Sequence, residues 1–160
     1  MSGFESVFVE HREFIFKYLM KFTKDPALAE ELTQETFFRG YMNYAALKNK
    51  EKVAVWLCRI AKNAYFAWYN GQKKQAPLDT VEEWAGEESF EERFIQKESS
   101  RLALARVHGL EDPYKEVFLL SVLGGFSFKD ISSVFGKSES WARVTFYRAK
   151  QKIVEQMRDC

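Results

Sequence analysis

Four side chains near the end of the chain have the types and the spacing needed to bind duplex DNA. They are Arg143, Val144, Tyr147 and Arg148, which point to one side if the segment is helical. Guanidinium groups bind phosphates and guanine edges, and apolar groups contact thymine methyls. An ordinary helical hairpin with solvated charges is the alternative. DNA binding is favoured because only Glu139, near the helix start, opposes these cations, whereas a solvated face usually mixes its signs.

Two predicted helices must hold these side chains in place. The glycine pair at 124–125 breaks the chain, and Ser127 with Asp130 three residues later has the spacing of a capping box. Gly136 then supplies a tight turn, and Ser138 is a suitable N-cap for the second helix. The apolar residues of the two helices are Ile131, Val134 and Phe135, then Ala142, Phe146, Ala149 and Ile153. A short helix, a turn and a helix with a basic outer face form the pattern of a helix-turn-helix.

A second group of residues could bind unpaired nucleic acid. A lysine-rich loop with Lys48, Asn49 and Lys50 precedes a predicted helix that contains Trp56, Arg59, Lys62 and Asn63. Cations follow the phosphate backbone, and aromatic rings stack on exposed bases. The alternative is that the aromatic residues of this helix are core, and we expect Trp56 and Ile60 to be partly buried in either case.

An acidic face on another predicted helix could dock on a protein. Asp25 and Pro26 mark its start, and its packing side is predicted to be Ala29, Leu32, Thr36 and Gly40. A different face carries Glu31, Gln34, Glu35 and Phe38. Carboxylates beside an exposed aromatic ring suit a basic protein surface. A solvated helix face explains these residues equally well.

Composition limits the class of protein. The 160 residues are 46% hydrophobic and 16% aromatic, with a net charge of +1 and three prolines, and the helical periodicity predicts an all-α fold. Isolated Cys58, Cys160, His11 and His108 suggest neither a disulfide nor a metal site. No nucleophile–base pair or phosphate-binding glycine loop stands out, so we expect no catalytic residues and no cofactor. No apolar run is long enough to span a membrane, and we expect a cytoplasmic protein.

A change in composition predicts two domains. Residues 75–93 hold a proline, a glycine and seven acidic residues, and we predict a flexible acidic linker there. The predicted helical domains are then residues 1–74 and 94–160.

Three segments together resemble the bacterial RNA polymerase sigma factors of the extracytoplasmic-function (ECF) group. They are AEELTQETFFRGY (29–41), VWLCRIAKNAYF (55–66), and LEDPYKEVFLL (110–120) followed by FSFKDISSVFGKSESWARVTFYRAKQKI (126–153). The resemblance covers nearly the whole chain. It rests on the order and spacing of the segments, since each is only moderately specific alone.

The resemblance implies a sigma region 2 bundle and a sigma region 4 helix-turn-helix, with core RNA polymerase (its clamp and flap) and promoter DNA as partners. It assigns polymerase binding to Glu31, Gln34, Glu35 and Phe38. It assigns the melted −10 element to Lys48, Asn49, Lys50, Trp56, Arg59, Lys62 and Asn63. It assigns the −35 duplex to Arg143, Val144, Tyr147 and Arg148, and it implies a separate anti-sigma factor.

Three departures from the family pattern leave details open. Glu31 stands where Asp is common, Trp141 and Ala142 replace a frequent Thr-Val pair, and Thr145 replaces a frequent basic residue. The −35 sequence is therefore not predicted. Two other classes remain as alternatives, a stand-alone helix-turn-helix regulator and a helical adaptor that holds polymerase without touching DNA.

Overall fold

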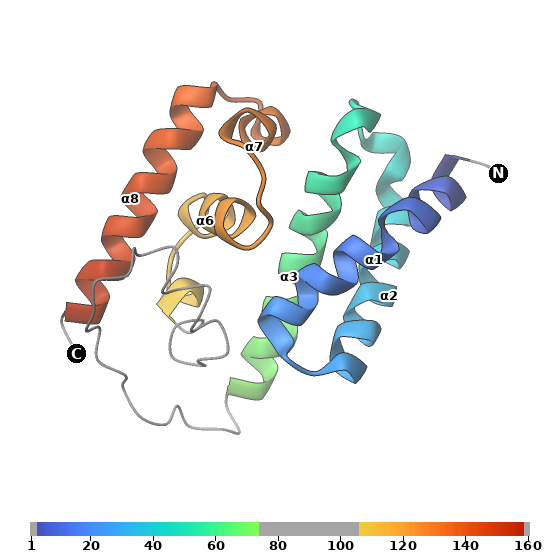
Figure 1. Ribbon diagram of the computed structural model, residues 1–160, viewed down its shortest axis with the longest axis horizontal. Helices are drawn as coiled ribbons and strands as arrows, with labels where there is room; N and C mark the ends of the chain where they lie inside the picture. Colours follow the sequence, from blue (N-terminus) through green and yellow to red (C-terminus); the bar gives the residue numbers. More distant parts are fainter. Residues whose placement is uncertain (1–2, 74–105, 159–160) are drawn as a thin grey trace.

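The structure, a computed structural model, describes residues 3–73 and 106–158, and within these ranges the regular elements are helices (Figure 1). The first group is α1 (Gly3–Thr23), α2 (Pro26–Asn43) and α3 (Val53–Lys73), with short 3-10 turns η1 (Tyr44–Ala46) and η2 (Lys50–Lys52) between α2 and α3. The second group is α6 (Tyr114–Val122), α7 (Phe128–Phe135) and α8 (Glu139–Arg158). The prediction of an all-α protein with two helical domains is confirmed. The predicted linker, 75–93, lies outside the described residues, and the domain boundaries stay predictions.

The first group forms a three-helix bundle in which each helix buries one side. α2 begins where predicted, because the Asp25 carboxylate accepts hydrogen bonds from the backbone N–H groups of Ala27 (3.0 Å) and Leu28 (3.4 Å). Gly40 lets α2 approach closely, since a Cβ there would lie 3.1 Å from a Leu57 methyl and 3.2 Å from the Phe4 ring. The predicted packing side of α2, which is Ala29, Leu32, Thr36 and Gly40, is buried.

The second group is a helix-turn-helix built on α6. The Ser127 hydroxyl accepts the N–H of Asp130 at 3.1 Å, and the Ser138 hydroxyl accepts the N–H of Trp141 at 3.1 Å, so both predicted caps are formed. Gly136 ends α7 with φ +66°, a left-handed conformation that glycine adopts without strain. α6 begins at Tyr114, and the Asp112 carboxylate just before it accepts the N–H of Glu116 at 3.2 Å.

The core of the second group lies between α6 and α8. The predicted apolar stripe of α8, which is Ala142, Phe146, Ala149 and Ile153, is buried. The Phe146 ring stacks on the ring of Phe118 with centroids 5.9 Å apart, and Phe128 packs beside it at 5.4 Å. This aromatic contact fixes the angle at which α8 presents its outer face.

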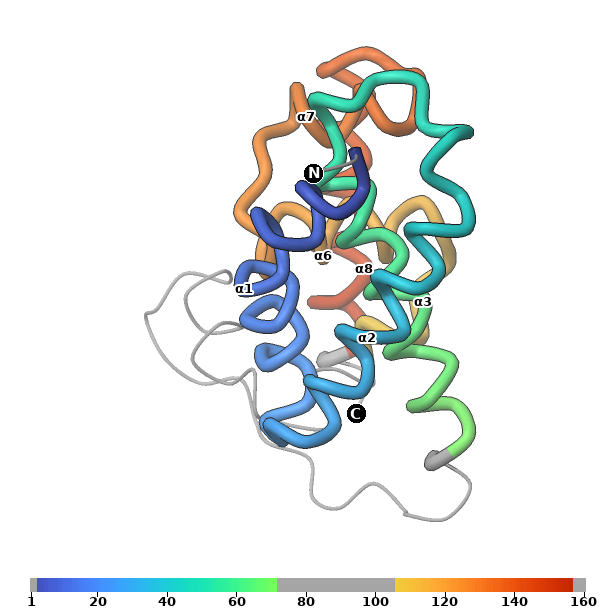
Figure 2. Tube along the Cα trace, turned by 90° about the vertical axis from the view of Figure 1, so that its right-hand side faces the viewer, coloured from blue at the N-terminus to red at the C-terminus, as the bar shows by residue number. Residues whose placement is uncertain are grey.

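The two groups contact each other mainly through α3. This helix packs on α1 and α2 with one side and on α6 and α7 with another (Figure 1). Turning the molecule shows that α7 lies beside the start of α3, where η2 also contacts it (Figure 2). None of the helices in the described ranges has an apolar stretch long enough to cross a membrane.

Candidate nucleic-acid and polymerase interfaces

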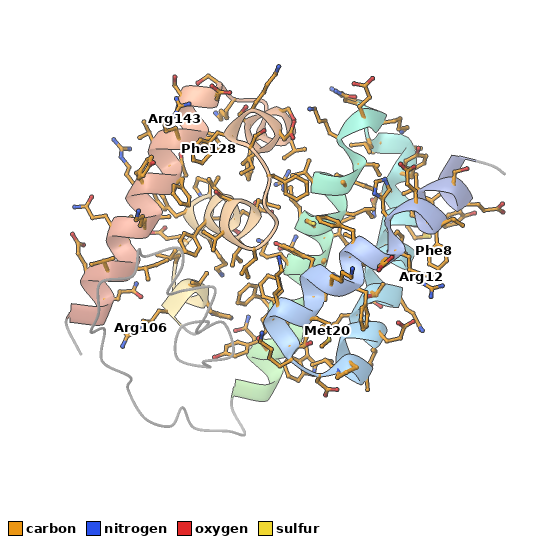
Figure 3. The ribbon with its side chains drawn as sticks, in the orientation of Figure 1. Phe8, Arg12, Met20, Arg106, Phe128 and Arg143 are labelled. Atoms are coloured by element: carbon orange, nitrogen blue, oxygen red, sulfur yellow. The ribbon has the colours of Figure 1, made fainter. Side chains whose placement is uncertain are left out.

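The outer face of α8 is open to solvent. Arg143, Val144, Tyr147 and Arg148 are all exposed, with 47% of Val144 and 54% of Tyr147 accessible. The guanidinium of Arg143 lies 3.4 Å from the Glu139 carboxylate and 5.7 Å from the centre of the Phe128 ring. Arg143 and Phe128 lie together at the α7 end of α8, on the flank away from α1 and α2 (Figure 3). The structure therefore brings the four predicted residues onto one accessible surface.

The internal contact that Arg143 makes on this surface is weak. An exposed ion pair one helical turn apart, such as Arg143 with Glu139, contributes only about 0.3–0.5 kcal/mol. Little free energy is therefore needed for a phosphate or a guanine edge to replace Glu139 as the partner of Arg143. Thr145 replaces a residue that is often basic in ECF sigma factors. It is buried and is not part of this surface.

The outer face of α2 is exposed from Glu31 to Phe38, which is about two helical turns. Glu31, Gln34, Glu35 and Phe38 all face solvent, and Phe38 is 63% accessible. The Glu35 carboxylate accepts a hydrogen bond from Arg39 Nε at 2.8 Å. A protein surface that binds here would meet carboxylates followed by an aromatic ring.

An apolar area that sequence reasoning missed extends this face. Tyr41 and Met42 are 66% and 65% accessible, and they follow Phe38 at the three- and four-residue steps that place side chains on one helix face. A shallow groove continues from Phe38 onto α1, where it is lined by Phe4, Phe8 and Val9 together with Phe37 and Glu5. The three- and four-residue spacing of Phe38, Tyr41 and Met42 in the sequence could have predicted this apolar area. Figure 3 shows Phe8 and Arg12 on this flank, far from Arg143.

The lysine-rich loop and the start of α3 form a pocket. Of the seven residues predicted to bind unpaired DNA, four line it, namely Lys48, Asn49, Trp56 and Arg59. Ser133 and Val134 of α7 form part of its wall. The pocket is therefore shared between the two helical groups, which the sequence did not suggest.

The loop that borders this pocket is held in shape by its own polar groups. Asn49 caps η2 by accepting the N–H of Glu51 at 3.0 Å. Lys50 donates to the carbonyls of Tyr44 and Leu47, each at 2.6 Å, and its ammonium lies 4.1 Å from the centre of the Tyr44 ring. Trp56 is half-buried near Tyr44, as expected. Lys50 thus orders the loop in this structure and is not among the pocket-lining residues.

Two residues of α3 that were predicted to bind DNA, Arg59 and Lys62, form ion pairs with carboxylates of the second group. Arg59 Nε and Nη2 donate to the two carboxylate oxygens of Glu116 at 2.9 and 3.3 Å. Lys62 is buried and lies 3.3 Å from Asp112 and 3.6 Å from Glu116. Asn63, the next residue, is exposed. The structure therefore separates Lys62 and Asn63 from the pocket.

Further polar ties join the two groups. Lys52 of η2 donates to the Asp130 carboxylate at 2.7 Å, and Lys21 of α1 donates to the carbonyl of Leu123 at 2.8 Å. The hydrogen bond from Lys52 is the largest cause that lowers the pKa of Asp130 below its ordinary value of 3.8. Because the folded-state pKa is the lower one, this tie stabilises the fold above about pH 4 and is lost as the pH falls further. Burial lowers the pKa of Lys115, whose ammonium lies 5.0 Å from the centre of the Phe66 ring.

Known families match both helical groups. Residues 7–75 match the family profile described as Sigma-70 region 2, and residues 100–153 match the one described as Sigma-70, region 4. Together these matches span well over half of the chain, in the order that the structure shows. The chain belongs to the sigma-70 family, in its ECF group. The expected family is confirmed.

Relatives of this ECF sigma factor match along most of their length. ECF RNA polymerase sigma factor SigM of Bacillus subtilis is 28% identical over 140 residues, which cover 87% of this chain and 85% of SigM. RNA polymerase sigma factor CarQ of Myxococcus xanthus is 26% identical over 154 residues, covering 96% of this chain and 88% of CarQ. The sigma factor RpoE of Bartonella quintana, solved in complex with the anti-sigma factor NepR, has the same fold with a TM-score of 0.54 at 14% identity, covering 97% and 96% of the two chains.

These matches decide between the functions that the sequence left open. The ECF sigma factor directs transcription initiation at promoters, with core RNA polymerase and promoter DNA as its partners. A stand-alone regulator is not favoured, because the region 2 bundle accompanies the helix-turn-helix.

Proposed function

We propose that three parts of the molecule, the outer face of α2, the pocket at the start of α3 and the outer face of α8, have separate roles in initiation. The α2 face docks on the polymerase clamp, the pocket beside Lys48 and Asn49 holds the unpaired −10 strand, and α8 reads the −35 duplex while its domain contacts the flap. The main support for this assignment is the α8 face, because the four residues predicted from helical spacing lie on one accessible surface above a buried core. A sigma factor of this kind acts within the polymerase holoenzyme and catalyses no reaction of its own.

Transcription with purified components tests the whole assignment. Core RNA polymerase is supplied with genomic DNA fragments, with and without the protein, and new transcripts are mapped. Discrete start sites at a fixed distance from two shared upstream elements are expected. Unchanged transcription, together with a DNA shift by the protein alone, would revive the stand-alone regulator.

Reversing the charge of Glu35 should weaken polymerase binding without unfolding the protein. Glu35 is half-exposed and paired with Arg39, so Glu35→Lys leaves the core intact. A basic docking surface would then face a cation, and we expect the affinity for core polymerase to fall about tenfold or more, which is about 1.4 kcal/mol. Fluorescence anisotropy of the labelled protein titrated with core enzyme measures this.

Glu13→Lys is the matched control for that experiment. Glu13 is also an exposed carboxylate paired one turn away with a cation, Lys17 at 3.0 Å, but it lies on α1. Its reversal should leave polymerase affinity unchanged. Equal losses in the two variants would show a general charge effect and remove α2 from the interface.

An anti-sigma protein is a further proposed partner. The support is that the fold of this chain is shared by RpoE, which was solved with its anti-sigma factor. A protein that co-purifies with the tagged chain from its native cells, and that stops transcription in the purified system, is the expected result. If only polymerase subunits co-purify, the proposal of an anti-sigma partner is wrong.

A further inference from the structure

The outer side of α1 carries an apolar centre between two opposite charges. Glu5, Val9 and Arg12 follow one another at steps of four and three residues, so they share one face of the helix, and Phe8 lies beside them. All four side chains are exposed, with 64% of Val9 and 37% of Phe8 accessible. Phe8 and Arg12 lie on the flank of the molecule away from the second domain (Figure 3). We call these four residues the α1 stripe.

Neither charge of the α1 stripe has an ionic partner in the described part of the chain. The ion pairs that α1 forms lie elsewhere on the helix, such as Lys17 with Glu13 at 3.0 Å. The Arg12 guanidinium lies 5.9 Å from the centre of the Phe8 ring, a contact that keeps it beside the apolar centre. A binding partner can therefore pair with Glu5 at one end of the stripe and with Arg12 at the other.

The order of these charges makes the α1 stripe complementary to itself. Glu5 and Arg12 lie about 10 Å apart along the helix axis, and Phe8 and Val9 are the two residues midway between them. Two α1 helices can pack antiparallel about a twofold axis that passes between Phe8 and Val9. Glu5 of each copy then faces Arg12 of the other, and Phe8 of each copy faces Val9 of the other. Because such a contact is isologous, the ion pair and the apolar contact each form twice.

We propose that the free ECF sigma factor forms a homodimer in which two α1 stripes pack antiparallel across the shallow groove lined by Phe8, Val9 and Phe38. The charge order favours a second copy as the occupant, because a purely basic or purely acidic helix would be repelled at one end of the stripe. The contact spans about two helical turns, so it should bury less than the roughly 1,200 Å² of a standard stable interface. A weak, reversible dimer is therefore expected.

This dimer covers part of the face that we assign to polymerase binding. Phe38 lines the groove and also belongs to the exposed face of α2, so a second copy on the groove obstructs a polymerase subunit that approaches α2. The dimer is then a storage form that core polymerase converts to monomer. This consequence rests on the proposed docking role of α2, whereas the dimer itself does not.

Exchanging the charges tests the pairing of Glu5 with Arg12. Sedimentation equilibrium from micromolar to near-millimolar concentration should show a reversible monomer–dimer transition for the parent protein. Arg12→Glu and Glu5→Arg should each weaken dimerisation about tenfold or more, because each places like charges together at both ends of the contact. An equimolar mixture of the two variants should dimerise as the parent does, and so should a chain that carries both substitutions. Both side chains are exposed, so the fold is kept.

Lys17→Glu is the matched control for Arg12→Glu. Lys17 is also an exposed cation of α1, but it lies off the α1 stripe, and its reversal should leave dimerisation unchanged. Val9→Glu places a carboxylate in the apolar centre of both copies and should leave a monomer whose circular dichroism matches the parent. A parent that stays monomeric at every concentration overturns the dimer and leaves the groove to a different protein. Equal weakening by Arg12→Glu and Lys17→Glu, or a mixture that fails to dimerise, overturns the assignment to the α1 stripe.

Size-exclusion chromatography with light scattering tests the competition with polymerase. Core polymerase added to the dimer should yield a complex with one copy of the sigma factor. A complex that retains the dimer would overturn the storage role. If the dilute monomer does not bind core polymerase at all, the proposed docking role of α2 is wrong, and the charge-exchange result still decides whether the dimer exists.

Discussion

Replacing Phe146 with alanine should strongly destabilise the second domain, with a loss of about 3–5 kcal/mol in the free energy of unfolding. The ring is only 4% exposed and packs between Phe118 and Phe128. Its removal leaves a cavity in the small core between α6, α7 and α8. Total domain stabilities are about 5–15 kcal/mol, so a loss of this size leaves the domain only marginally folded or unfolded at physiological temperature. Thermal unfolding followed by circular dichroism measures it.

Tyr147→Ala is the matched control, since it removes a neighbouring aromatic ring from the opposite side of the same helix. Tyr147 is exposed, so the change in unfolding free energy should stay within about 0.5 kcal/mol. Promoter binding by the holoenzyme should nevertheless weaken. A stability loss of equal size in both variants would mean that the two faces of α8 have been assigned wrongly.

The local features of the second domain could be predicted because they depend on neighbours in the sequence. Ser127, Gly136 and Ser138 fix the ends of α7 and α8 through backbone groups within a few residues of themselves. The alternation of buried and exposed residues along α8 follows from the helical repeat alone. These features require no knowledge of the rest of the chain.

The contact between the domains could not be predicted, because it joins residues far apart in sequence. Lys62 is a cation in a helix with a basic loop before it, which favours an exposed, DNA-binding position. It is buried because Asp112 and Glu116, some fifty residues later, surround it. Pairing partners over such a separation leave no periodic signal, and the same holds for Arg59 with Glu116.

The two proposed DNA surfaces differ in their electrostatics. On α8 a single exposed carboxylate, Glu139, opposes Arg143, whereas on α3 the carboxylate of Glu116 is buried against Arg59. Removing one member of a buried pair leaves an uncompensated charge, while an exposed pair separates freely. The free protein is therefore expected to engage duplex DNA through α8 more readily than unpaired DNA through α3.

Removing both arginines from the α8 face should nearly abolish −35 recognition. Each arginine that reads a base edge contributes about 1–3 kcal/mol, and Arg143 and Arg148 lie on one accessible surface. The Arg143→Ala, Arg148→Ala protein should therefore bind the promoter, as holoenzyme, at least about thirtyfold more weakly. Filter binding to a promoter identified by the transcription assay measures this.

Base substitutions in the −35 element distinguish reading from mere attraction. If Arg148 reads a base, Arg148→Ala should weaken binding to the native element but change little on DNA already altered at that base pair. Lys17→Ala, which removes one exposed cation from α1, should bind both DNAs as the parent does. A deficit of the same size on every −35 sequence, with a shallower salt dependence, would instead place Arg148 on a phosphate, because phosphate contacts carry no sequence information. The helix would then be held on the duplex by Arg148 and would read it through Arg143, Val144 and Tyr147.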